Sequence, residues 1–167
     1  MSPEQSDNPE GYYLVQASYT DQGANGIDPL RGNVQLTLRH PDVKAVAADQ
    51  FENTAKANAN GLNFVRFTQR NSWIAFDQID LRGIRQVEIL VNPAGIEGRL
   101  EIRLGSPTGP RIGISEVLLQ GDRRGYFTEV IPLKKSDETA DLYFVLKTDS
   151  GISIWNTFNL DRIQFLK

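Results

Sequence analysis

The chain contains no cysteine and only one histidine, His40. Without cysteine there is no disulfide and no thiolate ligand for a metal. A multi-histidine zinc site is also excluded, and a Ser-His-Asp triad would have to use His40, which stands beside Pro41 and is interpreted as a turn or surface residue. The sequence has no phosphate-cradling glycine loop and no GxSxG nucleophile turn. It therefore predicts a protein that is not an enzyme.

A large excess of charge and long hydrophobic runs are missing as well. The chain has 18 Lys and Arg against 21 Asp and Glu, a net charge of −3. This balance gives no general attraction to nucleic acid or anionic membranes. The longest apolar runs have the length of a strand, so we expect no membrane insertion. The polar opening, MSPEQSDNPE, reads as a linker, and we expect the chain to be a piece of a longer protein.

Two carboxylates about 5 to 10 Å apart could hydrolyse a glycosidic bond. Glu88, Glu101, Glu116 and Glu129 are available for such a pair. Each of them occupies an outward-facing or turn-proximal position of a predicted strand. A solvated sheet face accounts for all four, and a glycosidase is disfavoured.

From residue 63 onward the apolar pattern is that of β-strands. Segment 98–104 alternates apolar and charged residues, and the Gly/Ser/Pro-rich turn 105–110 leads into the next strand. Eight such segments are separated by short turns, at 63–69, 72–79, 85–92, 98–105, 111–120, 125–133, 140–148 and 158–167. Short strands at this spacing predict an all-β fold, an antiparallel jelly-roll β-sandwich.

The first sixty residues are less regular. Segments 11–21 and 34–40 have strand character, and 41–62 is predicted to be a loop with a short strand near 43–46. We divide the chain into a connector with one strand, 1–32, and a sandwich, 33–167. Tyr12, Tyr13 and Tyr19 of the connector are expected to pack against the sandwich edge.

Three segments, GRLEIRLGSPTGPRIG, ADLYFVLK and FNLDRIQF, resemble a family-six carbohydrate-binding module in order and spacing. That family typically reads "GGxIEVRLDSPTGPLIG … HDLYFVFKG … LFNIDWFQF". The resemblance covers roughly residues 63–167. It implies a jelly-roll fold and a non-catalytic, carbohydrate-binding module of a larger, periplasmic or extracellular multidomain protein. The connector segment is similar to those that precede such modules in secreted bacterial proteins.

The resemblance also implies positions for the sugar contacts. In the family, a Tyr before "GDW" and a Trp in "TGGW" enclose a sugar ring, and an Asn near the last strand hydrogen-bonds it. Here Arg66 stands at or near the Tyr position and Arg123 at the Trp position, where a slip in the alignment would place Tyr126 instead. Asn156 is the nearest match to the Asn, with Trp155 beside it.

These replacements leave two interpretations open. Arg66 and Arg123 would suit a polar or acidic glycan such as a uronate, because a guanidinium pairs well with a carboxylate. Alternatively, glycan binding is lost and the module is a structural or protein-interaction unit. Trp155 is either tucked under its loop or displayed for contact. Trp73 is interpreted as structural.

Asp161 shares the phase of Ile163 and Phe165, so its carboxylate is expected to point inward. An inward carboxylate must be paired, hydrogen-bonded or bound to metal. The family resemblance implies a structural calcium held by this Asp and a first-strand Glu. The Glu position holds Val46 or Ala47, which leaves Asp49 and Glu52 as the next carboxylates. Pairing of Asp161 with an arginine or with backbone amides is the alternative.

Overall fold

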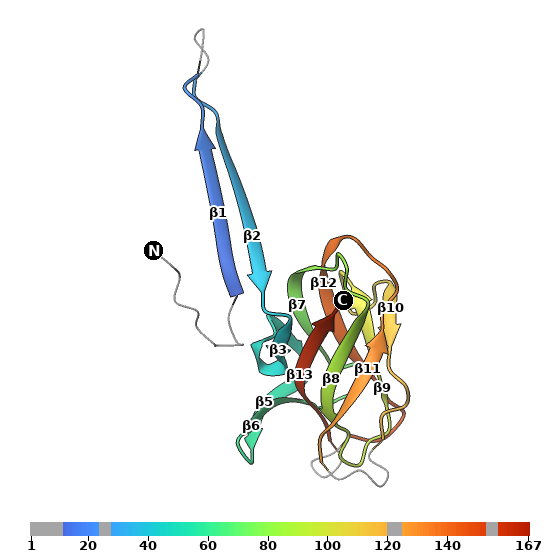
Figure 1. Ribbon diagram of the computed structural model, residues 1–167. Helices are drawn as coiled ribbons and strands as arrows, with labels where there is room; N and C mark the ends of the chain where they lie inside the picture. Colours follow the sequence, from blue (N-terminus) through green and yellow to red (C-terminus); the bar gives the residue numbers. More distant parts are fainter. Residues whose placement is uncertain (1–11, 24–27, 120–124, 153–156) are drawn as a thin grey trace.

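The computed structural model describes residues 12–23, 28–119, 125–152 and 157–167. Two antiparallel sheets pack face to face as a sandwich, and a two-stranded hairpin projects from it (Figure 1). The only helical element among the described residues is one 3-10 turn, Ala45–Ala47. The prediction of an all-β sandwich is confirmed.

One sheet of the sandwich carries the C-terminal strand. Its order is β11 (Phe127–Pro132), β8 (Gln86–Asn92), β13 (Phe158–Leu166), β6 (Leu62–Phe67) and β5 (Thr54–Ala59), and β3 (Asp42–Lys44) also pairs with β13. We call this the β13 sheet. The order of the other sheet is β10 (Arg111–Ile114), β9 (Arg99–Leu104), β12 (Thr139–Lys147), β7 (Trp73–Asp80) and β4 (Gln50–Glu52). We call it the β12 sheet.

The core lies between the sheets because alternate residues of each strand are apolar. In β8, Val87, Ile89 and Val91 are fully buried while their neighbours are half-buried. Pairs of phenylalanine rings meet edge to face in the core, Phe67 with Phe158 on the β13 sheet and Phe76 with Phe144 on the β12 sheet. Such edge-to-face pairs add to the gain from burial itself.

The turn at 105–110 depends on its glycines. Gly105 has a φ of +70°, and a Cβ at Gly109 would lie 1.9 Å from the carbonyl oxygen of Leu104. A side chain at Gly109 would therefore clash with the backbone of the preceding strand. The turn predicted for this segment is confirmed.

Two expectations about the first sixty residues are wrong. Residues 54–59 form β5, paired with β6 throughout, where a loop was predicted. Alanine, lysine and asparagine favour strands weakly, so pairing with the apolar β6 decides this element. Tyr13 and Tyr19 do not pack on the sandwich edge, since their side chains are 59% and 72% exposed.

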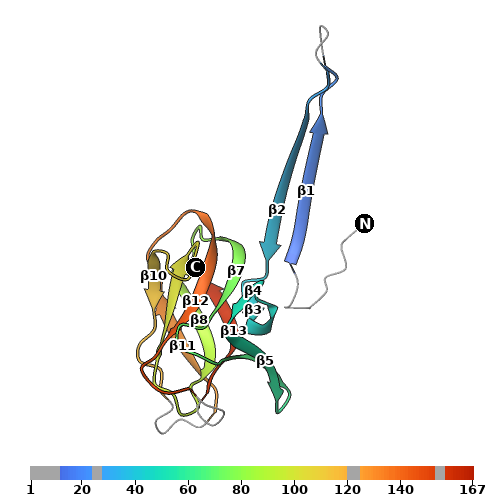
Figure 2. The same ribbon diagram turned by 180° about the vertical axis from the view of Figure 1, so that it is seen from behind.

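These tyrosines belong to the projecting hairpin, which consists of β1 (Tyr12–Thr20) and β2 (Arg31–Arg39). Nine residue pairs join the two strands. Seen from the front and from behind, the hairpin projects away from the sandwich (Figures 1 and 2). The second predicted strand thus pairs with the connector strand, and a boundary at residue 32 stays a prediction. No helix in the described ranges is long and apolar enough to cross a membrane.

Candidate functional site

A polar strip crosses the outer surface of the β13 sheet near its loop end. Asn159 of β13 pairs with Arg66 of β6 on one side and with Asn92 of β8 on the other. Directly paired residues project from the same face of a sheet. Because Val65, Val91 and Leu160 point into the core, Arg66, Asn92 and Asn159 project outward.

Tyr126 extends this row to a fourth strand. It precedes Phe127, which pairs with Val91, so it lies beside Asn92. Its ring lies 6.0 Å from that of Phe64, and the Arg66 guanidinium lies 5.9 Å from the Phe64 ring centre. We call Arg66, Asn92, Tyr126 and Asn159 the polar strip, with Phe64 as its apolar floor.

Each residue of the polar strip has a buried polar atom without a hydrogen-bond partner in the described part of the chain. These atoms are Arg66 Nε, Asn92 Oδ1, Tyr126 Oη and Asn159 Oδ1. Asn159 is 5% exposed and uses only its amide nitrogen, which donates to Thr157 Oγ1 at 3.1 Å. Buried polar groups are normally paired, because an unpaired one loses its water without compensation. The strip therefore has hydrogen-bonding capacity that no described residue uses.

The surroundings of Tyr126 change its acidity. Burial raises its pKa to about 12, the Asp161 carboxylate adds to the rise, and the Arg66 cation opposes it. The phenol is therefore neutral at physiological pH, and its hydroxyl can both donate and accept a hydrogen bond.

Asp161 itself is paired with a lysine. Its side chain is 1% exposed, and Oδ2 lies 3.1 Å from Lys44 Nζ of β3. The strands β3 and β13 are paired one residue away, at Arg162 and Lys44, so the backbone holds the two side chains together. An ammonium ion thus meets the need of the buried carboxylate for a positive partner.

The residues proposed for calcium do not form a ligand set in the described structure. Asp49 Oδ2 contacts Arg39 Nη2 at 2.6 Å and accepts the backbone N–H of Asp77. Glu52 is exposed on β4, and no three acidic or histidine side chains of the described ranges come together. Calcium prefers six to eight oxygens, commonly with several carboxylates. These residues therefore do not fit calcium in the described part of the chain.

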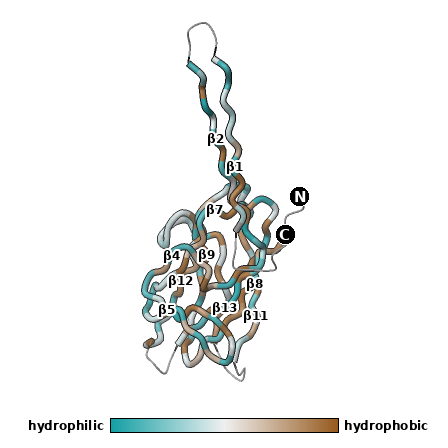
Figure 3. Tube along the Cα trace, turned by 90° about the vertical axis from the view of Figure 1, so that its left-hand side faces the viewer, coloured by the Kyte–Doolittle hydropathy of each residue, from teal (hydrophilic) through white to brown (hydrophobic). Residues whose placement is uncertain are grey.

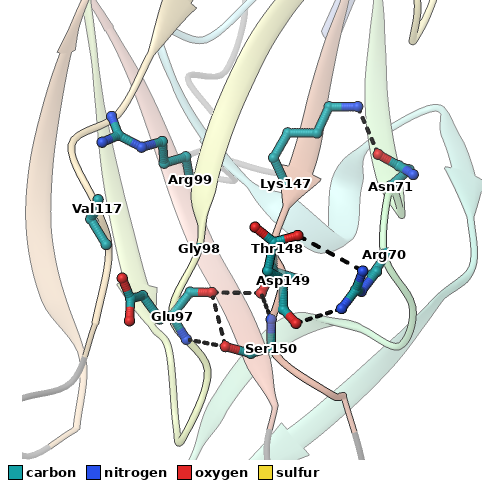
Figure 4. A pocket seen from close by; sticks show the side chains of 10 residues that line it. All are labelled: Arg70, Asn71, Glu97, Gly98, Arg99, Val117, Lys147, Thr148, Asp149 and Ser150. Carbon is teal, nitrogen blue, oxygen red and sulfur yellow. Dashed lines mark hydrogen bonds and ion pairs between the residues drawn. The ribbon is translucent and has the colours of Figure 1, made fainter.

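A pocket of about 650 Å³ opens at the loop end of the β12 sheet (Figure 4). Lys147 Nζ donates to Asn71 Oδ1 at 2.7 Å on one wall, and the Ser150 hydroxyl bonds to Glu97 on another. Arg70 reaches the Asp149 backbone carbonyl. None of the described residues that line this pocket is aromatic, so these residues can hydrogen-bond a ligand but offer it no ring for stacking.

The outer surface of the β12 sheet carries an aromatic pair. Trp73 and Tyr143 lie with ring centres 4.9 Å apart, edge to face, over Ala75 and Val145. Tyr143 Oη donates to Gln50 Oε1 at 3.4 Å. Trp73 therefore packs against other side chains, in agreement with its structural interpretation, although it remains half-exposed.

Glu101, next to this pair, differs from its predicted role. It was expected on a solvated face but is 6% exposed. Arg103 Nε and Arg111 Nη1 each donate to it at 2.9 Å. Burial by itself would raise the pKa of Glu101, but the hydrogen bonds from both arginines lower it below its ordinary value. The carboxylate is held ionised as part of a cation-rich cluster.

The structure brings together two of the five residues proposed to contact a glycan. Arg66 and Tyr126 both lie near the ring of Phe64. Arg123, Trp155 and Asn156 lie outside the described residues.

Sequence reasoning missed Phe64, Asn92 and Asn159. By alternation alone Asn159 shares the inward phase of Asp161 and Ile163, and it faces outward because the register of β13 shifts between Leu160 and Arg162. The register that aligns it with Arg66 and Asn92 was not visible in the sequence.

Comparison with known proteins agrees with this architecture. The model of carbohydrate binding module family 6 matches residues 44–167. The family 6 module of Clostridium cellulolyticum, solved with xylose, is 26% identical with a TM-score of 0.67, over 75% of this chain and 96% of that one. No curated protein sequence matches the chain.

Two further structures share the fold. A β-1,3-glucan-binding family 6 module from Bacillus halodurans is 22% identical with a TM-score of 0.62, over 75% of this chain and 95% of its own. An arabinoxylan arabinofuranohydrolase from Bacillus subtilis gives the same identity and TM-score, but only 27% of that longer chain is covered. The sandwich strands and the match over residues 44–167 together show that this chain belongs to carbohydrate-binding module family 6, whose members bind carbohydrate without catalysis.

Proposed function

We propose that this module binds a glycan across the polar strip of Arg66, Asn92, Tyr126 and Asn159. The observation that carries this proposal is the set of four buried polar atoms without described partners on adjacent strands. Sugar hydroxyls can donate to the two asparagine oxygens and accept from the arginine. The Tyr126 ring, packed on Phe64, supplies the flat apolar surface on which a pyranose stacks.

The charge of the strip favours polar or acidic sugars. Asp161 is neutralised by Lys44, whereas Arg66 makes no ion pair with a described residue. The guanidinium is therefore free to meet a uronate carboxylate, which it can bind in a bidentate manner. Two related modules were solved with xylose and with cellobiose, and a third is described as β-1,3-glucan binding. Neutral oligosaccharides are therefore the ligands against which acidic ones are to be compared.

We place the module in a larger periplasmic or extracellular enzyme that acts on glycans. In the Bacillus subtilis arabinofuranohydrolase the matched segment is about a quarter of the chain, which supports such an arrangement. The runner-up is an interaction module without glycan affinity, which the exposed hairpin favours.

Calorimetry with xylo-, cello- and laminari-oligosaccharides and with oligouronates tests the proposal. We expect binding of at least one class. Tyr126→Phe removes only the hydroxyl, whereas Arg66→Gln removes the charge together with the guanidinium donors, so each should weaken binding severalfold, Arg66→Gln most for oligouronates. Arg82→Gln, on an exposed loop residue, is the matched control and should change nothing. No binding to any sugar by the folded protein would overturn the proposal. If only Trp73→Ala abolishes binding, the site lies on the β12 sheet instead.

A further inference from the structure

The hairpin has two chemically different faces. Paired residues share a face, so Tyr13, Val15, Ala17 and Tyr19 of β1 lie on the same side as Leu38, Val34 and Gly32 of β2. We call this the apolar face, and it carries no charge. The opposite face bears Gln16 bonded to Gln35, and Arg31 bonded to Thr20. Leu14 also lies on this opposite face, and from Val15 to Thr20 apolar and polar residues alternate along β1 (Figure 3).

The apolar face is exposed to solvent. Tyr19 is 72% exposed, Val34 69% and Tyr13 59%. Two-stranded hairpins are marginally stable in water unless their apolar face is covered. A contiguous exposed apolar surface of this kind marks an interaction site.

The sandwich is on the other side of the hairpin. Arg39, which alternates with Leu38 and so belongs to the polar face, forms an ion pair with Asp49 and lies over the ring of Phe76. At the base of the hairpin the polar face is therefore turned to the sandwich. The apolar face is turned away and is open to another molecule.

The apolar face is complementary to itself. When two hairpins stack about a two-fold axis parallel to their strands, β1 of one copy lies over β2 of the other. Tyr19 then faces Gly32 of the second copy, where nothing lies within 4 Å of a Cβ position, and Ala17 faces Val34. Large residues meet small ones at the tip, and no charge opposes the approach.

The area agrees with a reversible contact. At the exposures above, the tyrosines and aliphatic side chains present roughly 500 Å² per copy, so two copies remove about 1,000 Å² from water. This is the lower end of specific interfaces. A lipid surface fits less well, because the apolar face has no basic residue and Asp21 and Asp28 lie near the tip.

We propose that the apolar face of the β1–β2 hairpin is a dimerisation surface for a second copy of this chain. A dimer carries two polar strips, and two weak glycan sites in one assembly bind a polysaccharide more tightly than either alone. This gain in avidity rests on the proposed glycan site, whereas dimerisation does not.

Sedimentation velocity over a hundredfold concentration range tests the dimer directly. We expect a monomer at low and a dimer at high concentration. Val34→Lys places a charge in the apolar face and should abolish the dimer. Gln35→Lys adds the same charge on the polar face and should leave it intact. Circular dichroism and the melting temperature of the sandwich establish that both variants are folded.

A wild-type protein that stays monomeric at every concentration overturns the proposal. So does a dimer that Val34→Lys leaves unchanged. If neutral phosphatidylcholine vesicles pull the wild-type monomer out of solution on sedimentation but leave the Val34→Lys variant in solution, the apolar face binds lipid instead. Retention on an insoluble glycan should fall severalfold for Val34→Lys while its affinity for a single oligosaccharide is unchanged. If the wild-type protein dimerises but neither is retained on the insoluble glycan nor binds the oligosaccharide, only the glycan site is refuted.

Discussion

In the sandwich, β12 buries Leu142, Phe144 and Leu146 completely, whereas in the hairpin β1 leaves Tyr13 and Tyr19 more than half exposed. Both strands have nine residues. The difference is that β12 lies between β7 and β9 and beneath a second sheet, while β1 pairs only with β2. An apolar strand face is thus stabilising only when the topology supplies a partner, and a face without one is available for association.

The largest expected effect is the loss of stability caused by a substitution in the core of the sandwich. Phe144→Ala leaves a cavity in the sealed core and should lower the free energy of unfolding by about 4 kcal/mol. Val34→Lys in the hairpin should change it by less than about 0.5 kcal/mol, because the side chain is already in water. Urea denaturation followed by tryptophan fluorescence measures both. Equal losses would mean that the hairpin folds as part of the core.

Lys44→Met comes next, because it removes the only described cation at the buried Asp161. We expect a loss of about 2 to 3 kcal/mol, since breaking a buried pair leaves an uncompensated charge. The double variant Lys44→Met/Asp161→Asn should recover much of this loss. Calcium and EDTA should leave the melting temperature of the wild type unchanged. A clear rise with calcium would show that a metal stabilises this site.

Glu101→Gln tests the cation-rich cluster on the β12 sheet. Because the pKa of Glu101 is lowered in the folded protein, its stabilising effect is complete above its unfolded value of 4.5 and is lost as the pH falls through the folded value. We expect a loss of about 1 to 2 kcal/mol at pH 7 that shrinks below pH 4.5. Glu116→Gln, an exposed position, is the control. A loss that does not depend on pH would contradict the assignment.

The smallest effect is expected at Tyr126. Its pKa is raised to about 12, so the folded state holds the phenol proton more tightly than the unfolded state. The resulting stabilisation is present below pH 10 and is lost as the pH rises through 12. Absorbance at 295 nm should show a late-titrating tyrosine that disappears in Tyr126→Phe. Tyr19→Phe, at an exposed tyrosine of the hairpin, is the control. An unchanged late titration in Tyr126→Phe would place the shifted group elsewhere.

The structure differs from the sequence-based predictions at residues 54–59 and at Glu101. Alternation identified the eight later strands, but it could not show that residues 54–59 pair with β6, because their composition favours strands weakly. Glu101 was assigned to a solvated face from its phase alone. Its burial comes from Arg103 and Arg111 on neighbouring positions of the β9–β10 pair, which local sequence does not encode.

For the candidate site, the sequence provided Arg66, Tyr126 and the inward Asp161, together with the absence of a cysteine or histidine cluster. The order of strands β11, β8, β13 and β6 decided that Arg66, Asn92, Asn159 and Tyr126 form one row. The pairing of β3 with β13 decided that Lys44 meets Asp161. The physical reason is that residue type and alternation act over a few positions, whereas these contacts join strands far apart in the chain. The sequence by itself determined the alternation of apolar and polar residues in the later strands, and only the tertiary structure decided which outward side chains share one surface.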